Sequence, residues 1–376
     1  MNKITDSLKN HYESTFSLSS GELYEPLKGL DLAAHYRRIE LLDSIPLPDL
    51  STSTVVDYGV GSWGFGCIFE KLKSCAKPIG IDISEVAIAL SEKTSLEDPH
   101  LAGKSVRFMT SNGYKFNLDD DSVDVFFCGE CIEHIEDTVA FLTEIFRVMK
   151  PGATAIFTTP NASPWLYRQL GLKWCVGFEH VALMDFTEFK KYLGDFFLVK
   201  RILGFNMTIH PSLNSYVPIE LQNRWVQTGL DDPENATSLI AVVEKSATPL
   251  TKKPQATRIV EWREAVIDGD SEELILIDDV TGIMIRDKSI IKLDVPEGMT
   301  RCNLIFWGHD WSGTTEIVVG SKKYNIDLYQ EPSGCIRVTI DLNLAPDISI
   351  SSFPIHNTKA KDSQVIFYRA VFAGDK

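Results

Sequence analysis

The stretch Val55-Val56-Asp57-Tyr58-Gly59-Val60-Gly61-Ser62 decides the fold of this chain. Its apolar, β-branched beginning predicts a buried strand, which runs directly into two glycines. Gly59 and Gly61 let the backbone approach a ligand closely, and the helix expected at 64–74 directs unpaired N–H groups at an anion. Gly59, Gly61 and Gly64 also match the dinucleotide-binding pattern G-x-G-x-x-G. The glycine spacing alone is therefore compatible with a nicotinamide cofactor as well.

Strands and helices alternate on the C-terminal side of this stretch. Strands are predicted at 54–58, 78–81, 105–109, 123–128, 153–159, 196–202 and 238–244, and helices at 64–74, 84–93, 137–150 and 186–193. The alternation predicts right-handed βαβ units and an α/β fold, a seven-stranded, doubly wound Rossmann-like sheet covered on both faces. Before it, helical spacing from Leu30 to Leu42 predicts a helix that Pro46 ends.

The character of the sequence changes after residue 247. Residues 248–257 contain two prolines and two lysines and are predicted to be a linker. Beyond them lie only short alternating segments, at 258–263, 274–277, 290–295, 303–307, 316–319, 324–328, 336–342 and 365–372. We therefore expect an all-β sandwich domain at 258–376 and an α/β domain at 1–247.

The length, charge and apolar pattern of the chain argue against several classes of function. A chain of 376 residues exceeds the usual limit for one core, which favours two domains. The formal charge of −15 opposes a phosphate backbone, so no nucleic-acid partner is expected. The chain has no run of eighteen apolar residues and its first residues lack the apolar core of a signal peptide, which predicts a cytoplasmic protein that is not integral to a membrane.

Cysteine usage predicts reduced thiols. Seven cysteines spread along the chain do not suggest a disulfide framework. Cys128 and Cys131 have C-x-x-C spacing, which is compatible with a redox centre or half a zinc site. Because two further ligands at similar spacing are missing, no metal site is predicted, and the alternative is two small buried residues at a strand end.

Several segments, in the right order along the chain, resemble the motifs of class I S-adenosylmethionine-dependent methyltransferases. The first motif, D-x-G-x-G-x-G, is matched at Asp57, Gly59 and Gly61, with Trp63 in place of the third glycine. The stretch Gly129-Glu130-Cys131-Ile132-Glu133-His134-Ile135-Glu136-Asp137 and the later Lys150-Pro151-Gly152 resemble the fourth and fifth motifs. The resemblance covers residues 55–244 and implies a methyltransferase whose cofactor is S-adenosyl-L-methionine.

The resemblance also implies a set of cofactor contacts. Asp82 follows the second strand, where a carboxylate accepts from ribose hydroxyls, while a helix N-cap is better supplied by Ser84. Asn112 stands where the family has an acidic residue against adenine, although Asn-Gly is also simply a good turn. The implied contacts are Asp57, Gly59, Gly61, Ser62, Asp82, Ile83, Asn112, Gly113, Gly129 and Glu130.

Transfer of a methyl group to a hydroxyl needs a group that takes the proton. His134 and His180 lie in segments expected to border the pocket, and each imidazole can accept a proton near neutral pH. The alternative for each is a hydrogen-bonded histidine that fixes its loop. Glu130 is expected at the methionine end of the cofactor and is a further candidate base.

Aromatic residues suggest the acceptor. Trp165, Tyr167, Arg168 and Trp174 suit stacking on a sugar or a flat acceptor, or else form the small core of a lid. The loop around Trp307 and Trp311 in the second domain also suits carbohydrate, with a role in the sandwich core as the alternative. These features favour O-methylation of a glycan or glycoconjugate. The alternatives are methylation of a small aromatic or polyketide-like hydroxyl, with the sandwich serving dimerisation, and a non-catalytic scaffold in polysaccharide assembly.

Overall fold

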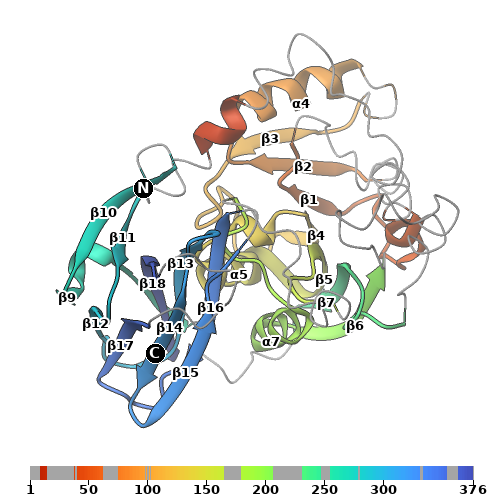
Figure 1. The fold of residues 1–376 in the computed structure, drawn as a ribbon. Coiled ribbons are helices and arrows are strands. Elements are labelled where there is room, and N and C mark those ends of the chain that lie inside the picture. Colours follow the sequence, from red (N-terminus) through yellow and green to blue (C-terminus); the bar gives the residue numbers. More distant parts are fainter. Residues whose placement is uncertain are drawn as a thin grey trace, which may run out of the picture.

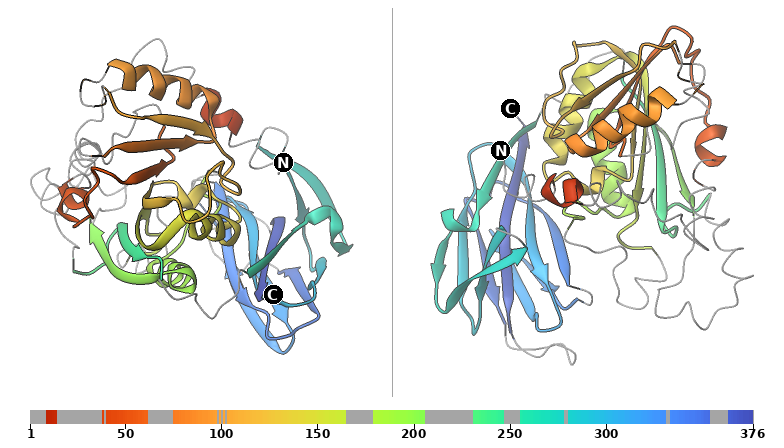
Figure 2. Two further views of the ribbon diagram at one scale, coloured as in Figure 1. Left: turned by 180° about the vertical axis from the view of Figure 1, so that it is seen from behind. Right: turned by 90° about the horizontal axis from the view of Figure 1, so that it is seen from above.

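The computed structural model has two parts, an α/β part and a β-rich part, that lie side by side (Figures 1 and 2). It describes residues 9–14, 38, 40–61, 75–97, 99, 101, 103–164, 179–205, 231–246, 255–277, 280–330, 333–353 and 363–375. The helix predicted at 64–74 and most of the one predicted from Leu30 fall outside these ranges. No helix among the described residues is long and apolar enough to span a membrane.

The α/β part is built on a seven-stranded sheet, counted over the described residues, in the order β3-β2-β1-β4-β5-β7-β6. Its strands are β1 Thr54–Tyr58, β2 Lys77–Asp82, β3 Arg107–Thr110, β4 Val123–Gly129, β5 Met149–Pro160, β6 Leu198–Phe205 and β7 Ser238–Glu244. The first five run parallel, and β7 pairs antiparallel with both β5 and β6. The predicted Rossmann-like sheet is confirmed, and the long connection before β7 returns the chain antiparallel between β5 and β6.

Helices cover the sheet because its central strands are apolar on both faces. The helices are α4 Glu85–Glu97, α5 Thr138–Val148 and α7 Phe186–Phe196, and a short 3-10 helix, η1, spans Ile132–His134. One face carries Val56, Phe126 and Phe157 and packs with α5 and α7. The other carries Val55, Val125 and Ile156 and packs with Ile88 of α4. Alternation along the strands thus builds two cores from one sheet.

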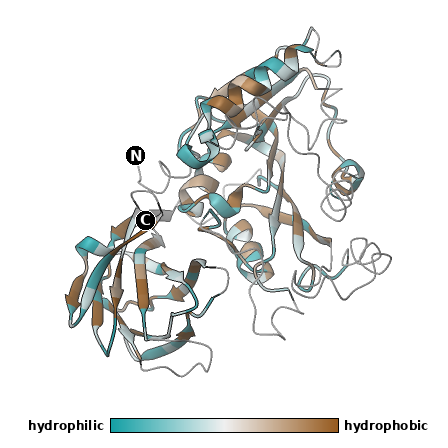
Figure 3. Ribbon diagram, turned by 45° about the horizontal axis from the view of Figure 1, so that its top comes forward, coloured by the Kyte–Doolittle hydropathy of each residue, from teal (hydrophilic) through white to brown (hydrophobic). Residues whose placement is uncertain are grey.

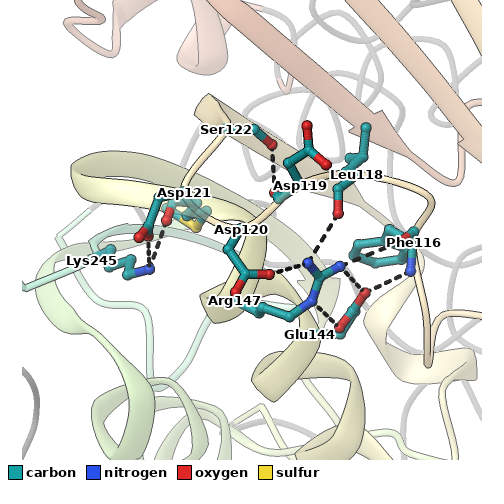
Figure 4. Close-up of polar contacts among 10 residues, drawn as sticks. Phe116, Leu118, Asp119, Asp120, Asp121, Ser122, Glu144, Arg147 and Lys245 are labelled. Carbon is teal, nitrogen blue, oxygen red and sulfur yellow. Dashed lines mark hydrogen bonds and ion pairs between the residues drawn. The ribbon is translucent and has the colours of Figure 1, made fainter.

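Arg147 holds the C-terminal end of α5 against the loop that leads into β4 (Figure 4). Its guanidinium donates to both oxygens of Glu144, to the Leu118 carbonyl at 2.9 Å and to Asp120 at 2.5 Å. Glu144 also accepts from the N–H of Phe116 at 2.6 Å. These bonds fix the entry of β4, the strand whose other end carries Glu130 and η1.

The β-rich part is an antiparallel sandwich, as predicted. Over the described residues one sheet has the order β10-β11-β18-β13-β16, with β8 on β18, and the other the order β15-β14-β17-β12-β9. The strands are β8 Gln255–Glu261, β9 Val266–Asp268, β10 Ser271–Ile277, β11 Val280–Ile285, β12 Ile290–Asp294, β13 Met299–Gly308, β14 Thr314–Val319, β15 Lys322–Asp327, β16 Gly334–Asp341, β17 Asp347–Ser352 and β18 Val365–Asp375, with a 3-10 helix, η2, at Trp262–Glu264. β8 begins inside the predicted linker.

Three of these strands were not predicted. β9 is only three residues long, and β11 contains a glycine. In β17 the buried residues Ile348 and Ile350 alternate with Asp347, Ser349 and Ser351, which are exposed or partly exposed. The serines give this strand the composition of a loop. Alternating colours along the strands of the sandwich show the same two-faced pattern (Figure 3).

Strand β13 is buried on both faces because it lies between the two parts. Its even-numbered residues Leu304 and Phe306 join the sandwich core. Of its odd-numbered residues, Ile305 packs with Val181 and Ala182 of the α/β part, and Asn303 donates to the Tyr192 hydroxyl at 2.8 Å. The joint between the parts is therefore a packed interior, and α5 and α7 lie beside it (Figure 1).

Candidate functional site

The glycine turn after β1 has the geometry that its sequence predicts. Gly59 and Gly61 have φ angles of 76° and 61°, which favour glycine. A Cβ on Gly59 would also stand 2.9 Å from both the Cβ and the Sγ of Cys131, so the end of β4 packs directly on this turn. Ser62, another predicted cofactor contact, lies outside the described residues.

Asp82 joins the glycine turn to the end of β2. One carboxylate oxygen accepts from the N–H of Gly61 and the other from the N–H of Ser84, both at 2.9 Å. Burial raises the pKa of Asp82, and the backbone N–H groups act against that rise. Ser84, rather than Asp82, caps α4, because its hydroxyl accepts from the N–H of Ala87 at 3.0 Å. The side chain that was expected to hold ribose therefore also fixes the shape of the turn.

Asp57 lies beside this arrangement. It is 3% exposed in the middle of the sheet. Burial, and then the neighbouring Asp82 carboxylate, raise its pKa well above the usual value. Asp57 comes two residues before Gly59, and its contact with the cofactor stays a prediction.

The remaining predicted cofactor residues lie at the carboxyl ends of neighbouring strands. Asn112 accepts through its side chain from the N–H of Tyr114 at 3.2 Å, which makes the turn after β3. Gly113 has a φ of 85°, and a Cβ there would meet the Tyr58 hydroxyl at 2.8 Å. Ile83 follows Asp82 directly, and Gly129 ends β4. β1 and β4 are neighbours from which the chain continues in opposite directions, the switch point at which such sheets bind ligands.

Glu130 occupies a strained position just after β4. Its φ of 47° is unusual for a residue with a side chain. Its carboxylate lies 3.3 Å from the guanidinium of Arg38, a residue that the sequence did not single out. Its place at the methionine end of the cofactor and its role as a base stay predictions.

His134 and His180 lie next to each other although 46 positions separate them in the sequence. Their ring centroids are 4.8 Å apart. Together with Glu133 they form a cluster in which one ligand-type atom from each residue lies within 4.8 Å of the others. The main chain joins the two segments, since the N–H of Ala182 donates to the Glu133 carbonyl at 2.8 Å. Glu133 was missed as a site residue, although its position next to His134 in the motif was a signal.

Burial keeps His134 of this cluster neutral. Burial, helped by the nearby His180, lowers the pKa of His134 to about 3. Its Nδ1 lies 2.8 Å from the carbonyl of Glu179, which can only accept, so Nδ1 carries the proton and Nε2 presents a lone pair. Burial, and then the charge of Glu130, raise the pKa of Glu133 well above its usual value.

Residues 9–14 form a helical turn that covers this region. The Tyr12 hydroxyl lies 3.2 and 3.3 Å from the two ring nitrogens of His134. Glu13 accepts from the N–H groups of Glu85 and Val86 at the start of α4, at 2.8 and 3.2 Å. Sequence reasoning missed these residues, because nothing in their local pattern distinguishes them from an ordinary exposed helix.

The predicted acceptor residues Trp165, Tyr167, Arg168 and Trp174 lie outside the described residues. Asn161, just before them, is buried, and its amide donates to the carbonyl of Ala236 at 2.7 Å, so it ties two loops together. Cys128 and Cys131 are both free thiols, and burial is among the causes that raise the pKa of each.

The α/β part is similar in sequence to known methyltransferases. Residues 56–157 match the family described as a methyltransferase domain. The demethylmenaquinone methyltransferase of Lactococcus lactis subsp. lactis is 29% identical over 124 residues, which are 32% of this chain and 48% of that protein. A ubiquinone biosynthesis O-methyltransferase of Pseudomonas putida is 28% identical over 198 residues, 48% of this chain and 79% of that protein.

Solved structures are also similar. The S-adenosylmethionine-dependent methyltransferase of Mesorhizobium loti aligns with a TM-score of 0.40 and 16% identity, over 58% of this chain and 100% of that one. The chain spans about half the length of the first curated relative, and the family match lies within the α/β part. The strand order and the family match confirm a class I, Rossmann-like methyltransferase fold for this part.

Proposed function

We propose that this chain is an S-adenosyl-L-methionine-dependent methyltransferase that methylates a hydroxyl oxygen. The observation that carries the proposal is the meeting of three elements at the carboxyl ends of β1, β2 and β4. The glycine turn, the Asp82 carboxylate and the cluster of Glu133, His134 and His180 all lie there. The methyltransferase-domain match over residues 56–157 supports the cofactor.

The cofactor supplies a methyl group on a positively charged sulfur. The acceptor oxygen forms a bond to the methyl carbon while the carbon–sulfur bond breaks, and the hydroxyl proton leaves. The chain must hold the oxygen in line with that bond and keep water out. Orientation of this kind is worth on the order of 7 to 11 kcal/mol. Residues 9–14, which cover the cluster through Tyr12, help to enclose the site.

Removal of the hydroxyl proton is assigned to the cluster. Oxygen as the acceptor atom is supported by the O-methyltransferases among the relatives and by the adjacent rings of His134 and His180. The cluster offers two ways to lower the cost of the step: His180 takes the proton, or a bound cation makes the hydroxyl more acidic. The lowered pKa of His134 makes this histidine a poor proton acceptor near neutral pH, contrary to the expectation from the sequence.

For the acceptor we propose a glycan or glycoconjugate. Trp311 is 45% exposed at the end of β13, beyond the partly exposed Trp307. Trp307 lies opposite Cys335, which packs in the same cluster as Val181, next to His180. Trp307, at the start of the aromatic loop, is therefore paired with a residue that packs against the α/β part. Aromatic rings with polar neighbours bind sugars well.

A small phenolic acceptor is the second candidate. It is supported by the relatives whose names refer to ubiquinone biosynthesis and to demethylmenaquinone. A panel of sugars, glycolipids and phenols, assayed for formation of S-adenosylhomocysteine, separates the two classes.

Calorimetry with S-adenosylmethionine and S-adenosylhomocysteine tests the proposal itself. The wild-type chain should bind both saturably, and Asp82→Asn should weaken binding at least tenfold. Asp294→Asn, which changes an exposed aspartate of the sandwich, is the matched control and should leave affinity unchanged. Absence of saturable binding by the wild-type chain would overturn the proposal.

A further inference from the structure

We propose that Glu133, His134 and His180 form a binding site for a divalent transition-metal cation, which would hold the acceptor oxygen. The site itself depends only on these residues. The role of the cation in methyl transfer rests on the proposed function above.

The donor atoms are close to the spacing that one cation requires. Ligand atoms about 2.0 to 2.1 Å from a tetrahedral cation lie about 3.3 Å from one another. In the cluster the donors all lie within 4.8 Å of each other, and Nε2 of His134 is 4.0 Å from Oε1 of Glu133. Side-chain movements of about 1 Å, well within rotamer adjustment, would close the site.

Each of two donors has a partner that orients it. The Thr159 hydroxyl donates to Oε2 of Glu133 at 3.1 Å, which leaves Oε1 directed at His134. The Glu179 carbonyl accepts from Nδ1 of His134 at 2.8 Å, which leaves the lone pair of Nε2 for the cluster. A carbonyl on the far nitrogen of a histidine is the usual outer support of a metal ligand.

Burial and charge favour a cation at this place. The side chain of Glu133 is 2% exposed and that of His134 is 15% exposed. A buried carboxyl facing two imidazoles is costly when ionised, and a cation would stabilise it. Glu130, three residues before Glu133, has a cationic partner of its own, because Arg38 lies 3.3 Å from its carboxylate.

The side chain of Tyr12 lies next to Nε2 of His134, the nitrogen that would bind the cation. Its hydroxyl lies 3.3 Å from Nε2 of His134. A bound cation would take the place of this hydroxyl at Nε2, and residues 9–14 would then close over an occupied site.

The donor set selects the kind of cation. Two imidazoles and one carboxylate suit Zn²⁺, Mn²⁺, Fe²⁺ or Co²⁺, whereas Mg²⁺ and Ca²⁺ prefer oxygen. A cation with an open position lowers the pKa of a bound hydroxyl. The hydroxyl proton then passes to solvent, and the oxygen forms its bond to the methyl carbon as the carbon–sulfur bond breaks.

Titration of the metal-free full chain with Co²⁺ tests the site without any assay of activity. We expect one equivalent to bind and to produce visible absorption typical of nitrogen and oxygen ligands. Glu133→Gln and His180→Ala should each weaken binding at least tenfold. His309→Gln, a histidine of the sandwich, is the matched control and should bind as the wild-type chain does.

Further measurements separate the outcomes. Circular dichroism and binding of S-adenosylhomocysteine show whether each variant is folded, and His180→Ala provides the test if Glu133→Gln does not fold. Failure of the wild-type chain to bind one equivalent overturns the site, as does unchanged binding by folded Glu133→Gln and His180→Ala. Loss of binding in Cys131→Ala alone would assign the cation to the thiols instead and overturn it too. Cofactor binding without Co²⁺ binding would leave the proposed function standing.

Discussion

Arg369 of β18 and Glu136, two residues after His134, form an ion pair that is buried between the two parts of the chain. Nε of Arg369 lies 2.9 Å from Oε1 of Glu136, and Nη1 donates to Oε2 at 3.0 Å. The side chains are 0% and 1% exposed. The sandwich is thereby tied to the loop that carries the candidate site.

Removal of the arginine alone should destabilise the whole chain. Arg369→Met removes the guanidinium that faces the buried Glu136 carboxylate, and breaking a buried ion pair in this way costs about 3 to 5 kcal/mol. The double variant Arg369→Met/Glu136→Met should recover most of that loss, since an apolar pair of similar volume can replace a buried ion pair. Urea unfolding measures both. Arg263→Met breaks an exposed pair with Glu273 and should cost less than about 1 kcal/mol; equal losses in Arg369→Met and Arg263→Met would contradict this account.

Gly59→Ala should disturb the glycine turn more than the strain of a positive φ angle alone would. The positive φ costs about 1 to 3 kcal/mol for a residue with a side chain, and the new Cβ would also collide with Cys131. We expect at least tenfold weaker binding of S-adenosylhomocysteine by calorimetry. Gly103→Ala has a similar φ of 80° but no atom within 4 Å of the new Cβ, so it controls for the backbone strain. Wild-type affinity in Gly59→Ala would show that the turn does not hold the cofactor.

Glu144 should make the free energy of unfolding depend on pH in the acid range. Burial raises the pKa of Glu144, but hydrogen bonds from Arg147 and Phe116 outweigh it, and the pKa falls below its usual value. The folded chain therefore binds this proton less readily than the unfolded chain. The stabilisation is present above the unfolded pKa of about 4.3 and is lost as the pH falls through the folded value.

The measurement is the difference in unfolding free energy between the wild-type chain and Glu144→Gln. It should be largest near neutral pH and shrink below about pH 4.3. Glu92→Gln, which changes an exposed residue of α4, should show no such trend. A difference that is constant with pH would mean that the carboxylate charge is not what stabilises this contact.

Trp311→Ala should discriminate between the two acceptor classes. If the exposed ring stacks on a sugar, its loss raises KM for a glycan acceptor at least tenfold with little change in kcat, because only binding is affected. Leu344→Ala, at a residue that is 92% exposed in the same domain, is the control. With a phenolic acceptor, Trp311→Ala should leave KM unchanged. An unchanged KM for every sugar of the panel would remove the support for a glycan.

The sequence predicted what depends on neighbouring residues. The strand, the glycine turn and Ser84 as a helix cap follow from local periodicity and local hydrogen bonding. β17 was not predicted, because its serines are typical of a loop although its isoleucines face the core. The adjacency of His134 and His180 and the contact of Tyr12 with His134 were not predicted, because they join segments 46 and 122 residues apart. Their packing is set by the assembled sheet.

Because strand β13 packs against both parts of the chain, the boundary predicted at residue 247 is unsuitable for dividing the protein into fragments. A fragment ending at residue 247 would expose the wall against which Ile305 and Asn303 rest, including Val181 and the hydroxyl of Tyr192. Such a fragment should aggregate or bind chaperones during expression. Exchange of the sandwich for that of another protein would succeed only if the incoming strand carried a matching row of side chains on its outer surface.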